Sequence, residues 1–107
     1  LIPITIGENP DQLPQANLLK QNFPNPFNPE TRIPYSISEA AENVSLGVYN
    51  VKGQLIKTLH TGPAQPGNYL LIWDGTDLTG KSVTSGIYFS RLSIDGVSQT
   101  KKMIMMK

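Results

Sequence analysis

The sequence predicts an all-β domain, an antiparallel β-sandwich of about seven strands. Glycine and proline contribute 9 residues each to the 107, a content that favours short strands and turns over long helices. Apolar and polar residues alternate in short segments, and turn signals recur about every ten residues. No segment keeps a helical apolar period over three turns. Strands of this kind each bury one face, so two packed sheets follow.

Residues 1–16 are predicted to be a linker from an upstream domain, and the sandwich domain is assigned to 17–107. The linker holds three prolines and no sustained period, and proline stiffens a chain without filling a core. Residues 21–29 hold three further prolines, which enforce extended geometry and remove amide hydrogens. We call this segment the strap, and expect Phe23 and Phe27 to close the open end of the sandwich. The alternative is that the strap presents both rings to a partner.

The first long strand is predicted at 32–38, where Ile33, Tyr35 and Ile37 lie on one face. Because Pro34 lies inside this run, the strand is predicted to be an edge strand. Two strands follow at 44–49 and 55–59, and the turn containing Gly53 joins them as a hairpin. Residues 60–68 contain two glycines and two prolines and are therefore predicted to form a loop.

The strand predicted at 69–74 is apolar on both faces, which places Trp73 in the core. The alternative is that Trp73 and Tyr69 form an exposed platform for sugar rings. Asp77 and Gly80 fit the first and fourth positions of a type I turn. Asp95-Gly96 is a strong two-residue hairpin signal, so residues 86–94 and 97–106 are expected to pair.

Composition argues against several classes of function. Nine Lys and Arg against eight Asp and Glu leave a net charge of +1, which gives no broad cationic face for nucleic acid. The chain has no cysteine and one histidine, so thiolate and multi-histidine metal sites are not expected. No apolar run approaches the ~18–20 residues that insert into a membrane. Asp74 and Asp77 lack the calcium-loop pattern and are predicted to stabilise turns.

Catalysis is not expected either. The sequence has no Gly-x-Ser-x-Gly elbow, and none of its carboxylates forms a distinguished pair. The chain is therefore predicted not to be an enzyme, and neither a cofactor nor a metal is expected.

Five short motifs follow one another along the chain. They are 21–31 (QNFPNPFNPET), 48–54 (VYNVKGQ), 73–75 (WDG), 85–89 (SGIYF) and 101–103 (KKM). In this order they resemble the type A C-terminal sorting domain of proteins exported by the type IX secretion system, over about residues 18–107. The middle motifs also resemble the immunoglobulin-like domain of flagellar hook-capping proteins. The motif residues are Asn22, Pro24, Asn25, Pro26, Phe27, Asn28, Pro29, Trp73, Asp74, Gly75, Gly86 and Tyr88.

The resemblance implies an immunoglobulin-like β-sandwich that is not catalytic itself. It implies that the domain directs an upstream protein across the outer membrane and anchors it, with the type IX secretion machinery and a sortase-like surface peptidase as partners. A secreted or cell-surface location is implied, reached through the periplasm, with a signal peptide upstream of this fragment. The alternative is an immunoglobulin-like structural or carbohydrate-binding accessory module of a secreted hydrolase.

The final strand is expected to be the part that a partner recognises. Its apolar residues occupy both faces and its ends are cationic, whereas a sandwich strand buries one face. A free face or edge could then accept a partner strand, and self-association through this terminal strand is a further expectation. The alternative is an internal strand that the strap covers. The expected recognition residues are Lys101, Lys102, Met103, Ile104, Met105 and Met106.

Overall fold

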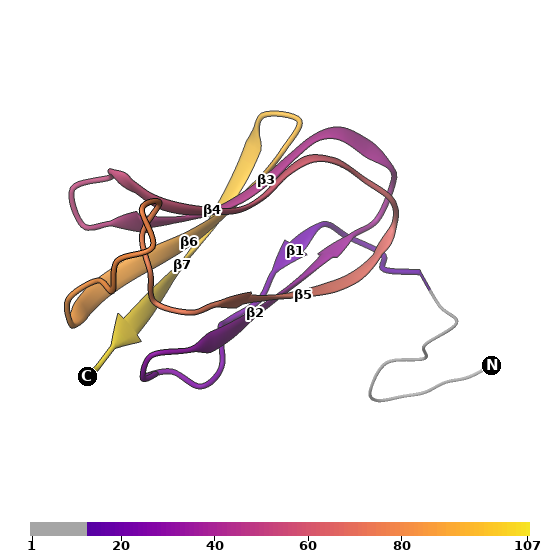
Figure 1. The fold of residues 1–107 in the computed structure, drawn as a ribbon. Helices are drawn as coiled ribbons and strands as arrows, with labels where there is room; N and C mark the ends of the chain where they lie inside the picture. The colour runs from indigo at the N-terminus through magenta and orange to yellow at the C-terminus, as the bar shows by residue number, and fades with distance from the viewer. Residues whose placement is uncertain (1–12) are drawn as a thin grey trace.

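The computed structural model describes residues 13–107, which form two antiparallel sheets packed as a sandwich (Figure 1). One sheet has the strand order β1-β2-β5 and the other has the order β4-β3-β6-β7. The strands are β1 (Leu18–Leu19), β2 (Thr31–Ile37), β3 (Ala41–Asn50), β4 (Leu55–Ala64), β5 (Gly67–Trp73), β6 (Gly86–Ile94) and β7 (Val97–Met105). The predicted all-β sandwich of about seven strands is confirmed. Within the described range there is no helix of the length and apolarity needed to cross a bilayer.

Strand β2 is central rather than an edge, because β1 pairs with one side of it and β5 with the other. The prediction of an edge strand from Pro34 is therefore wrong. The Pro34 carbonyl accepts a hydrogen bond from the Lys20 amide at 3.0 Å, so the missing N–H also points toward β1. Since β1 contains only Leu18 and Leu19, the proline interrupts a ladder that is already ending. A two-residue strand is too short to produce an alternating pattern in the sequence.

Strand β4 extends through the segment that was predicted to be a loop. It ends at Ala64, and only Gln65 and Pro66 separate it from β5. Because β4 is the edge of its sheet, Pro63 can place its missing N–H on the unpaired side without losing a ladder bond. Three register shifts against β3 accommodate the irregular backbone.

Both predicted hairpins are confirmed. The β3–β4 turn closes with a hydrogen bond from the Gly53 amide to the Asn50 carbonyl at 3.0 Å, and Gly53 has a φ of 81°. At the β6–β7 turn, Asp95 and Gly96 have φ values of 48° and 90°. Two successive positive φ angles suit a type I′ turn, which matches the twist of the paired strands.

Trp73 lies at the centre of the core. It has no exposed area, and its ring centroid lies 5.6 Å from that of Phe27 and 5.2 Å from that of Tyr88. Its Nε1 donates to the Thr76 carbonyl at 2.9 Å, so the buried indole is satisfied. The core assignment is confirmed and the platform interpretation is wrong, because a fully buried ring cannot stack on a sugar.

Candidate functional site

The strap runs along the outer edge of β7 near the end of that strand. Phe27 forms a parallel bridge with Met105. The Phe27 amide donates to the Ile104 carbonyl at 3.0 Å, and its carbonyl accepts from the Met106 amide at 2.9 Å. Asn25 Oδ1 accepts from the Ile104 amide at 3.0 Å. The edge groups of residues 104 and 106 therefore already have partners within the chain.

Side-chain hydrogen bonds connect β7 to residues 17–21 further back along the strand. Gln21 Nε2 donates to the Lys102 carbonyl at 2.8 Å. Gln99 Oε1 accepts from the Leu19 amide at 2.8 Å, and Gln99 Nε2 donates to the Asn17 carbonyl at 2.8 Å. These bonds join residues that are 80 to 82 positions apart. Together with the bonds at residues 104 and 106, they leave fewer backbone groups of β7 for the expected self-association, which would have to displace the strap at the end of the strand.

The six expected recognition residues divide into two groups. Met103 and Met105 face the core and are 0% and 1% exposed, because alternate residues of a strand face the same side. One face of this strand is therefore buried in the core, and Met103 and Met105, two of the expected recognition residues, lie on it. The side chains that remain accessible to a partner are Lys101, Lys102 and Met106, which are exposed, and Ile104, which is half-buried.

Buried polar side chains close the strap onto β2. Asn22 is buried, and its Nδ2 donates to Thr31 Oγ1 at 2.9 Å and to the Pro24 carbonyl at 3.2 Å. The Thr31 hydroxyl donates to the same Pro24 carbonyl at 2.9 Å. These groups satisfy one another where the prolines leave no ladder. Of the two rings, Phe27 is 2% exposed and Phe23 is 49% exposed, so the prediction that both close the sandwich holds for Phe27 alone.

The Trp-Asp-Gly motif joins the strap, the core and the last strand. Asp74 Oδ1 accepts from the Thr76 amide at 3.0 Å and from its hydroxyl at 2.6 Å, and the hydroxyl bond lowers the pKa of Asp74 below its ordinary value. Gly75 has a φ of 80°. A Cβ atom there would lie 2.5 Å from Met105 Cε and 2.9 Å from the Pro29 carbonyl oxygen. Glycine is needed for this close approach as well as for the backbone angle.

The next turn contains Asp77 and Gly80, as predicted. The Gly80 amide donates to the Asp77 carbonyl at 3.0 Å. Asp77 Oδ1 accepts from the Thr79 amide at 2.9 Å and its hydroxyl at 2.7 Å, and from the Lys81 amide at 3.1 Å. The Thr79 hydroxyl is the main cause of the lowered pKa of Asp77. Both aspartates therefore stabilise turns, and between residues 13 and 107 no three His, Asp or Glu side chains are placed to share a metal ion.

The other motif residues separate into buried and exposed sets. Tyr88 is buried, and its hydroxyl donates to the Thr84 carbonyl at 2.7 Å, which resembles the tyrosine corner of sandwich folds. Gly86 begins β6 with a φ of 154°. The exposed motif residues of the strap are Pro24, Asn25, Pro26, Asn28 and Pro29.

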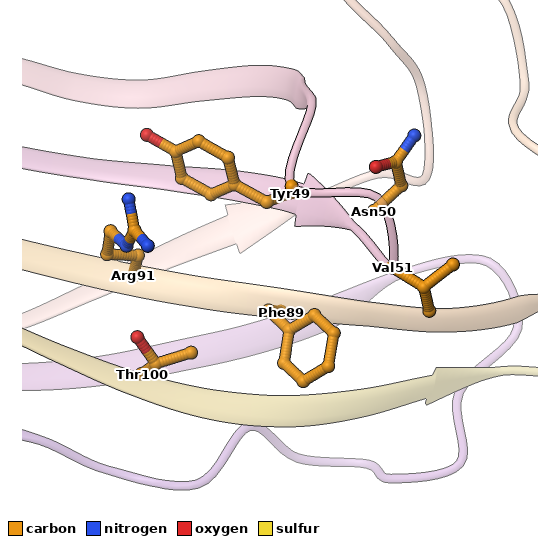
Figure 2. Close-up of a pocket in the computed structure, with 7 residues that line it drawn as sticks. Tyr49, Asn50, Val51, Phe89, Arg91 and Thr100 are labelled. Carbon is orange, nitrogen blue, oxygen red and sulfur yellow. The ribbon is translucent and has the colours of Figure 1, made fainter.

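A shallow groove on the outer face of the four-stranded sheet was not expected from the sequence (Figure 2). The Arg91 guanidinium carbon lies 4.9 Å from the centre of the Tyr49 ring, and Phe89 is opposite Tyr49 in the register. The groove measures about 230 Å³, which is smaller than a typical ligand pocket. These residues occupy ordinary outward positions of alternating strands, so their spacing carries no distinct sequence signal. We interpret the arrangement as a cation–π pair that stabilises neighbouring strands.

The chain resembles domains of several solved structures. It aligns with PorZ, a surface component of the type IX secretion system of Porphyromonas gingivalis, at a TM-score of 0.54 and 18% identity, covering 81% of this chain and 11% of PorZ. It aligns with latent dimeric PorU from Porphyromonas gingivalis at 0.61 and 22%, covering 98% and 10%. FLGD from P. aeruginosa aligns at 0.51 and 25%, covering 70% and 58%. No curated protein sequence matches the chain.

The chain thus spans about a tenth of the PorZ and PorU chains and just over half of the FLGD chain. These likenesses agree on the sandwich fold. A sequence match runs from Phe27 in the strap to Gly96 in the last turn. Because the FlgD Ig-like domain model matches residues 27–96, more than half of the sequence, the chain belongs to the family of FlgD Ig-like domains.

Proposed function

We propose that this domain is a non-catalytic C-terminal sorting and anchoring domain, which directs an upstream protein through the type IX secretion system across the outer membrane. The observation that carries the proposal is the pairing of the strap with the end of β7. Most of the strap and all of β7 lie outside the FlgD-type match at 27–96. The two motifs that separate the sorting resemblance from a hook-capping domain therefore meet in one surface. The fold likeness to PorZ supports the same assignment.

The recognition surface that we infer comprises the accessible side chains of β7 together with the exposed strap beside them. Lys101 and Lys102 are exposed, and Met106 is 57% exposed next to the strap. A cationic segment that ends in an apolar side chain suits a partner that offers carboxylates around an apolar contact. On this proposal the domain reaches the cell surface or the medium through the periplasm, and a sortase-like surface peptidase then separates it from its cargo.

The proposal is tested with a fluorescent reporter that carries the full 107-residue chain at its C-terminus. The reporter is expressed with an export signal in a bacterium with an intact type IX system and in a strain that lacks the outer-membrane pore of that system. We expect fluorescence at the surface or in the medium of the first strain and in the periplasm of the second. Retention in the periplasm of both strains, with the domain folded, would instead favour a structural accessory module.

The role of the accessible lysines is tested by charge reversal. Deletion of β7 cannot serve here, because it would also remove Met103 and Met105 from the core. Lys102→Glu changes an exposed residue beside the strap, and Lys52→Glu changes a lysine in the β3–β4 turn that is also exposed. We expect a several-fold loss of secreted reporter with the first change and none with the second. Equal secretion of the two variants would remove Lys102 from the recognition surface.

A further inference from the structure

Among residues 13–107, strand β5 is a regular edge that pairs with β2 on one side only. All seven of its residues keep a continuous register. Arg32 and Pro34 direct their backbone groups toward Phe23 and β1, away from β5. In an antiparallel pair, two opposite residues either both point their backbone groups toward each other or both point them away. Ile72 and Leu70, which lie opposite Arg32 and Pro34, therefore direct their N–H and C=O groups to the open edge.

The sheet face beside this edge is apolar and exposed. Leu70 and Ile72 are 50% and 51% exposed, and they lie opposite Pro34 and Arg32 of β2. Arg32 is the one charged side chain on the outward positions of these three strands. An uncharged regular edge next to an apolar face is a typical place for another strand to add. Leu18 and Phe23 extend the exposed apolar face.

We propose that β5 binds β5 of a second copy of this chain in antiparallel orientation, which joins the two three-stranded sheets into one sheet of six strands. The distribution of charge among the strand edges favours a second copy of β5 as the partner. The β5 sequence, GNYLLIW, carries no charge, whereas β4 contains Lys57 and β7 contains Lys101 and Lys102. Like charges facing each other across a strand pair are unfavourable, and the strap already occupies the end of the β7 edge. Among the strand edges that the structure describes, β5 is thus the one suited to meet its own copy.

The sequence of β5 is also self-complementary in this orientation. A two-fold axis through Leu71 places Leu70 of each copy opposite Ile72 of the other, so the two exposed apolar side chains form two identical cross-strand pairs. The same register brings together the backbone groups that point to the open edge. Because both copies use the same surface, the assembly closes at two copies. The contact is short compared with a standard interface, so we expect a weak dimer with a dissociation constant of ~0.1–1 mM.

Sedimentation equilibrium of the full chain between about 10 µM and 1 mM, the concentrations that bracket this range, measures the association. We expect the mass to rise toward that of a dimer. Leu70→Lys should weaken association at least about ten-fold, because it replaces both Leu70–Ile72 pairs and brings two lysines together as diagonal neighbours. The lysine stem fits a position that is already half exposed, and circular dichroism verifies the fold of the variant. Thr58→Lys, at an exposed position of the other free edge, should leave the dimer unchanged. A monomer at all concentrations, or a dimer that Leu70→Lys does not weaken, overturns the proposal.

Amide hydrogen exchange in the unsubstituted chain gives a second, independent measurement. The amides of Leu70 and Ile72 should exchange several-fold more slowly at high protein concentration, because pairing protects them. The Leu71 amide faces β2 in both states and should not change. Slowing confined to β4 or β7 amides would place the contact on another edge and refute the proposal. Neither measurement depends on secretion, so the dimer and the sorting function are tested independently of each other.

Discussion

Truncation of Phe27 tests how strongly the strap is integrated into the domain. Its ring is 2% exposed and packs 5.6 Å from the Trp73 ring. Removing a buried phenylalanine side chain costs about 3–5 kcal/mol of unfolding free energy. The backbone of residue 27 still pairs with the end of β7 in Phe27→Ala, so we expect the lower end of this range, about 3 kcal/mol.

Phe23→Ala is the matched control, because it makes the same change in the same segment at a ring that is 49% exposed. Half burial of a phenylalanine contributes about 1 kcal/mol. A destabilisation of 1 kcal/mol lowers Tm by about 4–8 °C in a domain of this size. Calorimetry or thermal circular dichroism should therefore show a fall of about 12–24 °C for Phe27→Ala and about 4–8 °C for Phe23→Ala. Urea unfolding followed by fluorescence of the single tryptophan gives the free energies directly.

Equal losses for the two variants would refute the reasoning, because the two rings would then be energetically equivalent despite their different burial. A loss below about 1 kcal/mol for Phe27→Ala would show that the strap unfolds separately from the core. Phe27→Leu retains most of the buried volume and should fall between the wild-type chain and Phe27→Ala. A leucine variant as unstable as the alanine variant would contradict a packing role.

Further tests address the loop and the core. Gly75→Ala should destabilise the domain by about 2–5 kcal/mol through backbone strain and steric overlap. Gly80 has a similar φ of 88° but open space around it, so Gly80→Ala should cost only about 1–2 kcal/mol. Equal denaturation midpoints for the two variants would contradict the role of close packing at Gly75. Trp73 emission should be blue-shifted, resistant to acrylamide and unchanged by polysaccharides, and ready quenching would contradict its burial. The pKa values of Asp74 and Asp77 are lowered in the folded state, so the stability they add is present above about pH 3.9 and is lost as pH falls through their folded values. Asp77→Asn should therefore reduce the acid-induced fall in Tm, and an unchanged pH profile would count against this role.

Local sequence signals predicted the architecture well because strand alternation and turn chemistry are local properties. Asp95-Gly96 specified its hairpin through backbone angles that these residue types tolerate. The period-two pattern around Trp73 placed that ring in the core correctly. The prediction of an edge strand from Pro34 failed because the effect of a missing amide depends on the length of the neighbouring strand, and β1 contains only two residues. Residues 60–64 of β4 were predicted to be a loop for a similar reason, because local composition does not show that the unpaired side of an edge strand can accommodate Pro63.

A strap that covers β7 was only the alternative to a free strand, and the individual contacts of this cover could not be predicted from local patterns. Its hydrogen bonds connect Asn17, Gln21 and Asn25 with residues about eighty positions away, and no spacing within either segment encodes such a pairing. Met103 and Met105 give the last strand its buried face, and the strap occupies the end of its edge, which agrees with the alternative of a strand covered by the strap. A partner of folded β7 must accordingly contact Lys101, Lys102, Ile104 and Met106 through their side chains, or displace the strap before it adds a strand. An edge that needs no such displacement is β5, on the opposite side of the three-stranded sheet from β1.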